Sequence, residues 1–105
     1  MTGNIQIQNN GMPVVLGGSG GCKGNSATGN FQVQNNTAQV TIGGSGSGFG
    51  NTAGGNIQVQ NNTGGGTLTA NTSTGGDCQL KNNTPGIVGS ANTASKGKNT
   101  CNGTA

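Results

Sequence analysis

The chain has 105 residues, and 24 Gly, 17 Asn, 14 Thr, 8 Gln and 7 Ser account for 70 of them. Only 27% of the residues are hydrophobic and 5% are charged, with four Lys, one Asp and no His. The length supports a single domain over residues 1–105, and the composition cannot supply a conventional globular core. Because paired carboxylates, a His base or a His-bearing zinc site cannot be built from these residues, we expect no enzyme activity, no metal and no cofactor.

The net charge of +3 comes from a shortage of acids rather than from a basic patch. Four scattered Lys without any Arg would make few phosphate contacts, so we expect no nucleic-acid binding. No apolar run approaches the roughly 20 residues that span a bilayer, so we expect no membrane insertion. Low hydrophobicity and abundant Gly are also typical of disordered chains. The internal repeat described next favours an ordered fold instead.

An eight-residue motif begins at Gly3 and recurs at Gly29 and Gly55, with a degenerate fourth copy at Gly76. Within each copy, apolar and polar residues alternate with period two, which predicts a strand with one buried face. The residues expected to point inward are Ile5, Ile7, Phe31, Val33, Ile57, Val59, Cys78 and Leu80. The residues expected to form an outward Gln face are Gln6, Gln8, Gln32, Gln34, Gln58, Gln60 and Gln79.

A second short apolar segment follows each motif, at residues 14–16, 40–42, 67–69 and 87–88. Strands repeated every 21–26 residues, separated by turns rich in Gly and Asn, are typical of a parallel β-solenoid (a parallel β-helix). We therefore predict an all-β, single-domain solenoid of about four coils that start near residues 3, 29, 55 and 76. The longer first two coils place extra residues in loops at 17–24 and 43–50.

Stacked coils bring equivalent side chains about 4.8 Å apart, so each repeated position becomes a ladder. One Asn ladder is expected at Asn10, Asn36, Asn62 and Asn83. A second is expected at Asn9, Asn35, Asn61 and Asn82. In either ladder, Asn tolerates left-handed backbone, and its amide can bond to the coils on both sides. The alternative is that these residues form only flexible polar turns.

Three cysteines in a small, nearly uncharged chain favour an oxidising, extracellular location. Cys101 follows Cys78 by 23 residues, which is within the coil spacing. The two Cα atoms should then lie about one coil apart, a distance compatible with a disulfide that clamps the segment 76–105. The alternative is two buried free thiols. Cys22 is left over, as an unpaired loop thiol or an intermolecular link.

The first coil begins at residue 3 with no segment to cover its outer edge, at Asn4, Ile5, Gln6 and Ile7. An uncovered strand edge accepts a matching strand, and a head-to-tail contact that does not close makes a filament. The other end carries Lys81, Lys96, Lys98 and the expected disulfide, which predicts a partial stop.

The copies of Gly-Asn-Ile-Gln-Val-Gln-Asn-Asn-Thr, together with the segment from Cys78 to Pro85 and a terminal Cys, resemble a group of uncharacterised bacterial secreted proteins. Those proteins carry Asn/Gly-rich β-helix repeats and a C-terminal module with the pattern CxxNTP…C. The resemblance implies a right-handed parallel β-helix and an extracellular address, and it supplies no catalytic residues. This chain has extra residues between Cys78 and the Asn-Thr-Pro of that pattern.

These features predict a structural protein that assembles with itself into an extracellular fibre or matrix by stacking coil on coil. The alternative is an ice-binding solenoid, against which the outward columns are Gln rather than paired Thr. A third possibility is a carbohydrate-binding or adhesive module, which the lack of Trp and Tyr weakens.

Overall fold

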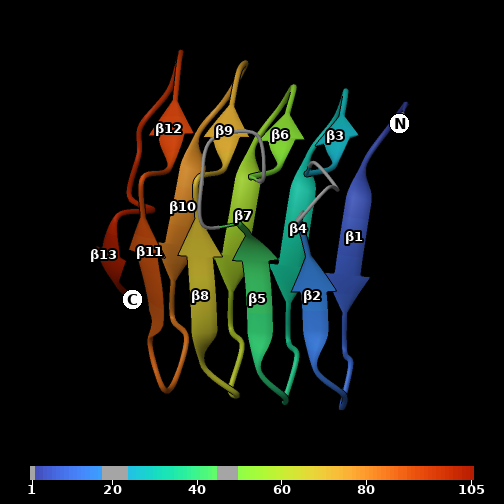
Figure 1. The fold of residues 1–105 in the computed structure, drawn as a ribbon, viewed down its shortest axis with the longest axis vertical. Helices are drawn as coiled ribbons and strands as arrows, with labels where there is room; N and C mark the ends of the chain where they lie inside the picture. Colours follow the sequence, from blue (N-terminus) through green and yellow to red (C-terminus); the bar gives the residue numbers. More distant parts are fainter. Residues whose placement is uncertain (1, 18–23, 45–49) are drawn as a thin grey trace.

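The computed structural model describes residues 2–17, 24–44 and 50–105, which form an all-β arrangement of mostly parallel strands (Figure 1). Thirteen strands are present in these residues, and no helix there is long and apolar enough to cross a membrane. The expected loop residues 18–23, with Cys22, and 45–49 lie outside the described residues. The all-β prediction is confirmed, and the stacked sheets are compatible with a β-solenoid.

The first sheet contains the four copies of the alternating motif. Its strands lie side by side in chain order, as β1 (Ile5–Gln8), β4 (Phe31–Gln34), β7 (Ile57–Gln60) and β10 (Cys78–Lys81). All neighbours are parallel, and the register aligns Ile5 with Phe31, Phe31 with Ile57, and Ile57 with Cys78. The predicted alternation is confirmed, because the apolar side chains of β4, β7 and β10 are buried and the Gln residues are not.

The second sheet contains the second apolar segment of each repeat. Its strands are β2 (Val14–Leu16), β5 (Val40–Gly43), β8 (Gly66–Thr69) and β11 (Ile87–Ser90), all parallel, followed by β13 (Gly103–Thr104), which pairs antiparallel with β11. The segments predicted here are confirmed and are extended by one or two residues in the last three strands.

A third sheet was not predicted. It consists of the two-residue strands β3 (Ser26–Ala27), β6 (Thr52–Ala53), β9 (Thr72–Ser73) and β12 (Thr93–Ala94), again parallel and in chain order. Their inward residues are Ala or Ser, which bury too little apolar surface to produce a hydrophobic pattern. Each repeat therefore supplies one strand to each of three sheets: β1–β3, β4–β6, β7–β9 and β10–β12.

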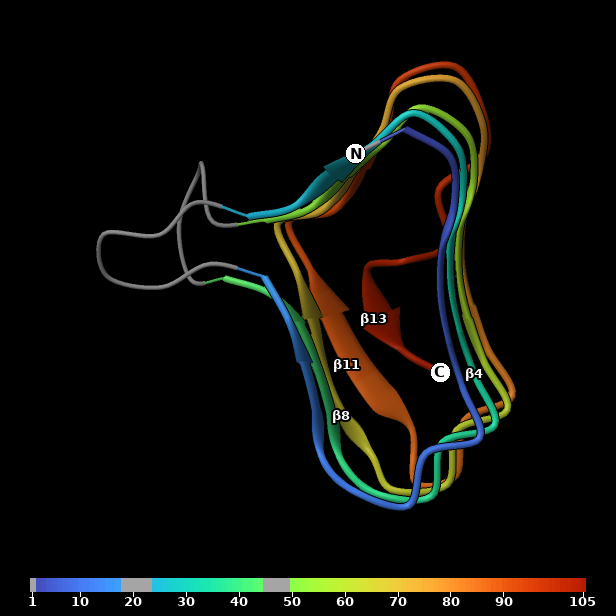
Figure 2. The same ribbon diagram turned by 90° about the vertical axis from the view of Figure 1, so that its right-hand side faces the viewer.

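One continuous core lies between the three sheets. Phe31, Ile42, Ile57, Leu68 and Ile87 are its largest buried apolar side chains, each at most 2% exposed. Viewed along the stack, the repeats superpose, and the three sheets face different directions around this core (Figure 2). The interior is small, so the polar ladders that line its corners carry much of the contact between repeats.

Candidate functional site

The Asn ladder at the end of the first sheet is present as predicted. Asn10, Asn36 and Asn62 each donate both the backbone N–H and the side-chain Nδ2 to Oδ1 of the next Asn, ending at Asn83, with distances of 2.9–3.1 Å. Nδ2 of Asn36, Asn62 and Asn83 also donates to a carbonyl oxygen of the preceding repeat. Each rung therefore fixes the repeat before it and the repeat after it.

A second Asn ladder leads into the third sheet, and sequence reasoning missed it. It runs through Asn25, Asn51, Asn71 and Asn92 to Asn102, with the same paired bonds from N–H and Nδ2 to the next Oδ1. The sequence does contain a pattern that could have predicted this ladder. An Asn followed by Ser or Thr and then by a small residue recurs at positions 25, 51, 71 and 92. Asn51 and Asn71 are fully buried, and no described buried side-chain nitrogen or oxygen lacks a partner.

The predicted ladder at Asn9, Asn35, Asn61 and Asn82 does not form hydrogen bonds between side chains within the described chain. These residues instead adopt left-handed backbone, with φ of 57–60°, and their side chains are exposed. Each turns the chain out of the first sheet, a task for which Asn is suited because it tolerates positive φ. The tolerance of Asn for left-handed backbone was part of the prediction. The predicted hydrogen bonds between these side chains were wrong.

A third column joins Asn4, Asn30, Asn56 and Asp77 just before the first sheet. In each, Oδ1 accepts the backbone N–H of the next member of the column, at 2.7–2.8 Å. Asp77 ends the column, and its Oδ1 accepts the N–H of Lys98 at 2.9 Å. The single acid of the chain thus replaces an Asn as an acceptor.

The outward Gln residues of the first sheet form a ladder on one of their two columns. Nε2 of Gln6 donates to Oε1 of Gln32, Gln32 donates to Gln58, and Gln58 donates to Gln79 at a longer 3.4 Å. The other column, Gln8, Gln34 and Gln60, lies beside it without side-chain hydrogen bonds among the described residues. Both columns give this sheet an uncharged amide face.

Among the described residues, no strand pairs with the outer edge of the first repeat, because β1, β2 and β3 are each terminal in their sheets; we call this the open edge. Ile5 and Asn9 donate their N–H groups to Asn30 and Gln34 of the second repeat. Successive residues of a strand direct N–H to opposite sides, so Gln6 directs its N–H away from the second repeat. Ile5 is also only partly buried, whereas its counterpart Phe31 is 1% exposed.

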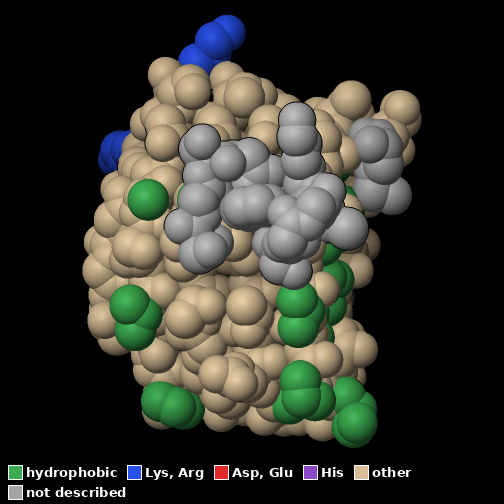
Figure 3. Space-filling view, viewed as in Figure 1, with side chains coloured by type: hydrophobic (Ala, Val, Ile, Leu, Met, Phe, Trp, Pro, Cys, Tyr) green, Lys and Arg blue, Asp and Glu red, His purple; other side chains and the backbone are tan. Residues whose placement is uncertain are grey.

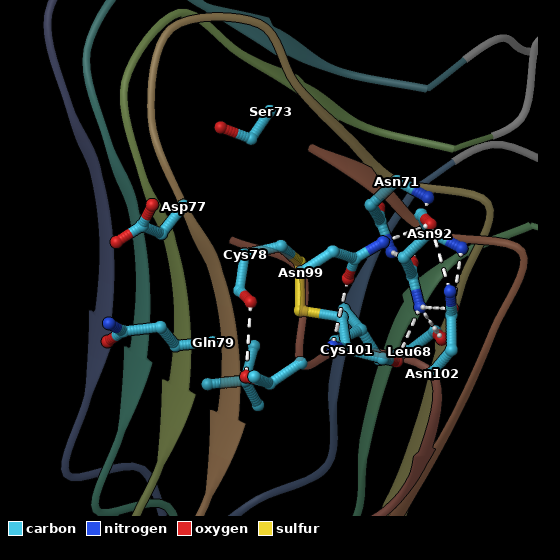
Figure 4. The surroundings of a disulfide bond; sticks show 12 residues. Leu68, Asn71, Ser73, Asp77, Cys78, Gln79, Asn92, Asn99, Cys101 and Asn102 are labelled. Carbon is cyan, nitrogen blue, oxygen red and sulfur yellow. Dashed lines mark hydrogen bonds between the residues drawn. A yellow bond between two sulfur atoms is a disulfide. The ribbon is translucent and has the colours of Figure 1, made fainter. Parts of the chain in front are cut away.

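The opposite end is covered by the last eight residues, 98–105, which we call the C-terminal segment. The predicted disulfide between Cys78 and Cys101 is confirmed, with a Cα–Cα distance of 5.7 Å (Figure 4). The N–H of Cys78 donates to the carbonyl of Lys98, and the N–H of Thr100 donates to the carbonyl of Cys78. In Figures 1 and 2, β13 lies beside β11 and across the end of the stacked repeats.

The described surface carries little charge. Side chains in Figure 3 are mostly uncharged, and Lys gathers at one edge. Met12, Val15 and Val88 are its large exposed apolar residues. Within residues 2–17, 24–44 and 50–105, neither a pocket nor a group of three potential metal ligands is found.

Comparisons with protein-family models, with curated proteins and with solved structures find no match to this chain.

Proposed function

We propose that this chain is a β-solenoid that acts as a structural, self-assembling extracellular protein. In this proposal the coils of separate copies stack end to end, in the manner of the repeats within one copy, and build a fibre or matrix. The observation that carries the proposal is the open edge of the first repeat. There, all three sheets end, and the apolar side chains of Ile5, Ile7, Val14 and Leu16 are only partly buried.

The ladders support stacking because they are unfinished at this edge. Oδ1 of Asn10 and Oε1 of Gln6 accept no hydrogen bond from the described residues, although the equivalent oxygens of Asn36 and Gln32 do. The backbone N–H of Asn4 also lacks the side-chain acceptor that Asn30 has. A coil of the same repeat would fill all these positions, and in this proposal that coil belongs to a second copy of this chain.

An extracellular location fits this role. A disulfide between Cys78 and Cys101 persists in oxidising compartments and is rare in the cytosol. Head-to-tail stacking joins two different surfaces, and such contacts make open filaments when the rotation does not close. The same geometry explains how a chain with a small core gains stability, since each added copy buries the partly exposed apolar residues of the next.

Charge at the open edge should abolish this assembly. Ile5→Lys or Ile7→Lys places an ammonium group against the core side of the first repeat, where a stacked coil would bury it unpaired. We expect the unaltered protein to form uniform filaments in reducing buffer, where the bond between Cys78 and Cys101 is broken, and these variants to remain discrete monomers there. Sedimentation velocity and electron microscopy over a concentration series provide the measurement.

The matched control is Val15→Lys, which adds the same charge to the same repeat at a side chain that is 75% exposed. It should assemble like the unaltered protein. Circular dichroism should show the same strand signal for all three variants. Filaments formed by the Ile5→Lys variant would contradict the proposal.

A second candidate function is ice binding, which one observation favours. The outward positions of the third sheet form a column of hydroxyl side chains, because the register aligns Ser26 with Thr52, Thr52 with Thr72, and Thr72 with Thr93. Thr28, Thr74 and Ser95 stand two residues further along in three of the four repeats. These hydroxyl positions could not be predicted as columns from the sequence, because the third sheet itself was not predicted.

Thermal hysteresis tests the second candidate. If the hydroxyl columns bind ice, the protein at high concentration should separate its melting and freezing points, and Thr72→Tyr should remove most of that gap by breaking the column. Gln58→Tyr alters the first sheet instead and should leave the gap unchanged. Absence of thermal hysteresis in the unaltered protein would exclude ice binding.

A further inference from the structure

The C-terminal segment satisfies the same bonding groups that each repeat otherwise presents to the next. Nδ2 of Asn83 donates to the main-chain oxygen of Ala105 at 2.9 Å. Asn92 donates its N–H to Oδ1 of Asn102 at 2.8 Å, and its Nδ2 to the carbonyl of Cys101 at 2.9 Å (Figure 4). Within earlier repeats, these donors bond to the next Asn of the ladder. Residues 98–105 therefore take the place of a following repeat at both buried ladders.

The core of the last repeat is also shaped to receive this segment. The register places Gly89 where the preceding repeats have Leu68, Ile42 and Leu16. A Cβ on Gly89 would collide with the carbonyl of Cys101. Cys101 itself is fully buried and belongs to the core cluster. The missing side chain at position 89 thus makes room for the C-terminal segment.

The surface beneath the segment complements the open edge of the first repeat. With residues 98–105 displaced, Asn83 and Asn92 would regain donors directed away from the stack. The first repeat of a second copy presents acceptors at the equivalent positions, on Asn10 and Asn25. Nε2 of Gln79, which donates to no described residue, faces the position that Gln6 of the second copy would fill. Donors then meet acceptors in the same order as between any two repeats.

We infer that the last repeat carries a docking surface for the first repeat of a second copy, and that residues 98–105 occupy this surface until they are displaced. The inference rests on the proposed function and specifies its partner and its control. Head-to-tail growth requires release of the segment, which the bond between Cys78 and Cys101 opposes. A copy with its segment in place can add to a filament through its first repeat, and its own covered end then stops growth.

Displacing the segment in the full chain tests the inference. Gly89→Leu restores the side chain that the other repeats have and excludes Cys101 from the core. Cys101→Asp acts from the other side, by placing a carboxylate at a fully buried position, and is studied under reductant. Sedimentation velocity should show the oxidised, unaltered protein near its monomer mass of 10.1 kDa. Both variants should show masses of several copies that rise with concentration.

A blocking substitution identifies the surface used. Gln6→Pro removes an outward N–H at a strand edge, where Pro is tolerated, and prevents pairing there. Combined with either displaced variant, it should restore the monomer. The two variants test the same point independently, because Gly89→Leu changes the repeat and Cys101→Asp changes the segment. The result can be interpreted as long as circular dichroism shows that at least one of them keeps its strands.

The outcomes separate the inference from the proposed function. If the oxidised protein and a folded displaced variant form equally large assemblies, and Gln6→Pro dissolves both, stacking stands and the covering role of residues 98–105 is overturned. If both remain monomeric at every concentration, the proposed function and the inference fail together. If the variants with a displaced segment assemble and Gln6→Pro has no effect, the last repeat does not dock the first repeat of a second copy. The inference is then overturned.

Discussion

Replacing Asn62 with Ala should lower the free energy of unfolding by at least about 3 kcal/mol, or prevent folding altogether. Asn62 is fully buried, and five hydrogen bonds run through its side chain or its N–H: two that Asn36 donates to its Oδ1, two that its own groups donate to Asn83, and one to the carbonyl of Val33. The backbone N–H survives the substitution, so buried polar groups lose partners in the repeats on both sides: Asn36 and the Val33 carbonyl in the second repeat, and Asn83 in the fourth. Each such group costs about 1–3 kcal/mol when left unsatisfied.

The neighbouring residue supplies the control. Asn61 has φ of 59° and an exposed side chain, so Asn61→Gly removes an amide without disturbing a ladder. We expect a change of less than about 1 kcal/mol for this variant, since Gly adopts positive φ without steric cost. Chemical denaturation followed by circular dichroism measures both. Equal effects of the two substitutions would show that the buried ladder does not hold the repeats together.

The first two sheets could be predicted because large apolar residues alternate with polar ones. In the motif, Phe31 and Val33 lie between Gln residues, and this pattern fixed both the strand and its buried face. The spacing of the motif gave the parallel register, and the spacing of Cys78 and Cys101 gave the disulfide. These inferences needed only local periodicity and a constant distance between repeats.

The third sheet and the C-terminal segment could not be predicted in the same way. Ala27 and Ala53 are core residues, but a lone small side chain beside Thr or Gly gives no hydrophobic alternation and favours the prediction of a turn. The turn of the chain at Cys101 into an antiparallel strand depends on tertiary contacts with β11. Its trace in the sequence is Gly89, a glycine at a position where other repeats have Leu or Ile. One glycine among 24 carries no signal until the register is known.

Gly66→Ala should be as damaging as the loss of a buried Asn, although it adds one methyl group. Gly66 lies in β8 with φ of 139°, and its neighbours across the sheet are Val40 in β5 and Ile87 in β11. A Cβ there would collide with the carbonyl oxygen and carbonyl carbon of Val40. Because that contact is backbone rather than the end of a flexible side chain, relief requires β5 and β8 to separate. Their ladder hydrogen bonds and the burial of Leu68 would be lost together.

Gly11→Ala is the matched control, since its Cβ would meet only Thr37 Oγ1 at an ordinary 3.7 Å. We expect Gly11→Ala to change the free energy of unfolding by less than about 1 kcal/mol, and Gly66→Ala to lower it by about 4 kcal/mol or more. Thermal and denaturant unfolding measure the difference. Equal stability of the two variants would mean that β5 and β8 do not pack as closely as the register requires. The proposed stacking of separate copies would then also be unsupported, because it assumes the same close packing as between repeats of one copy.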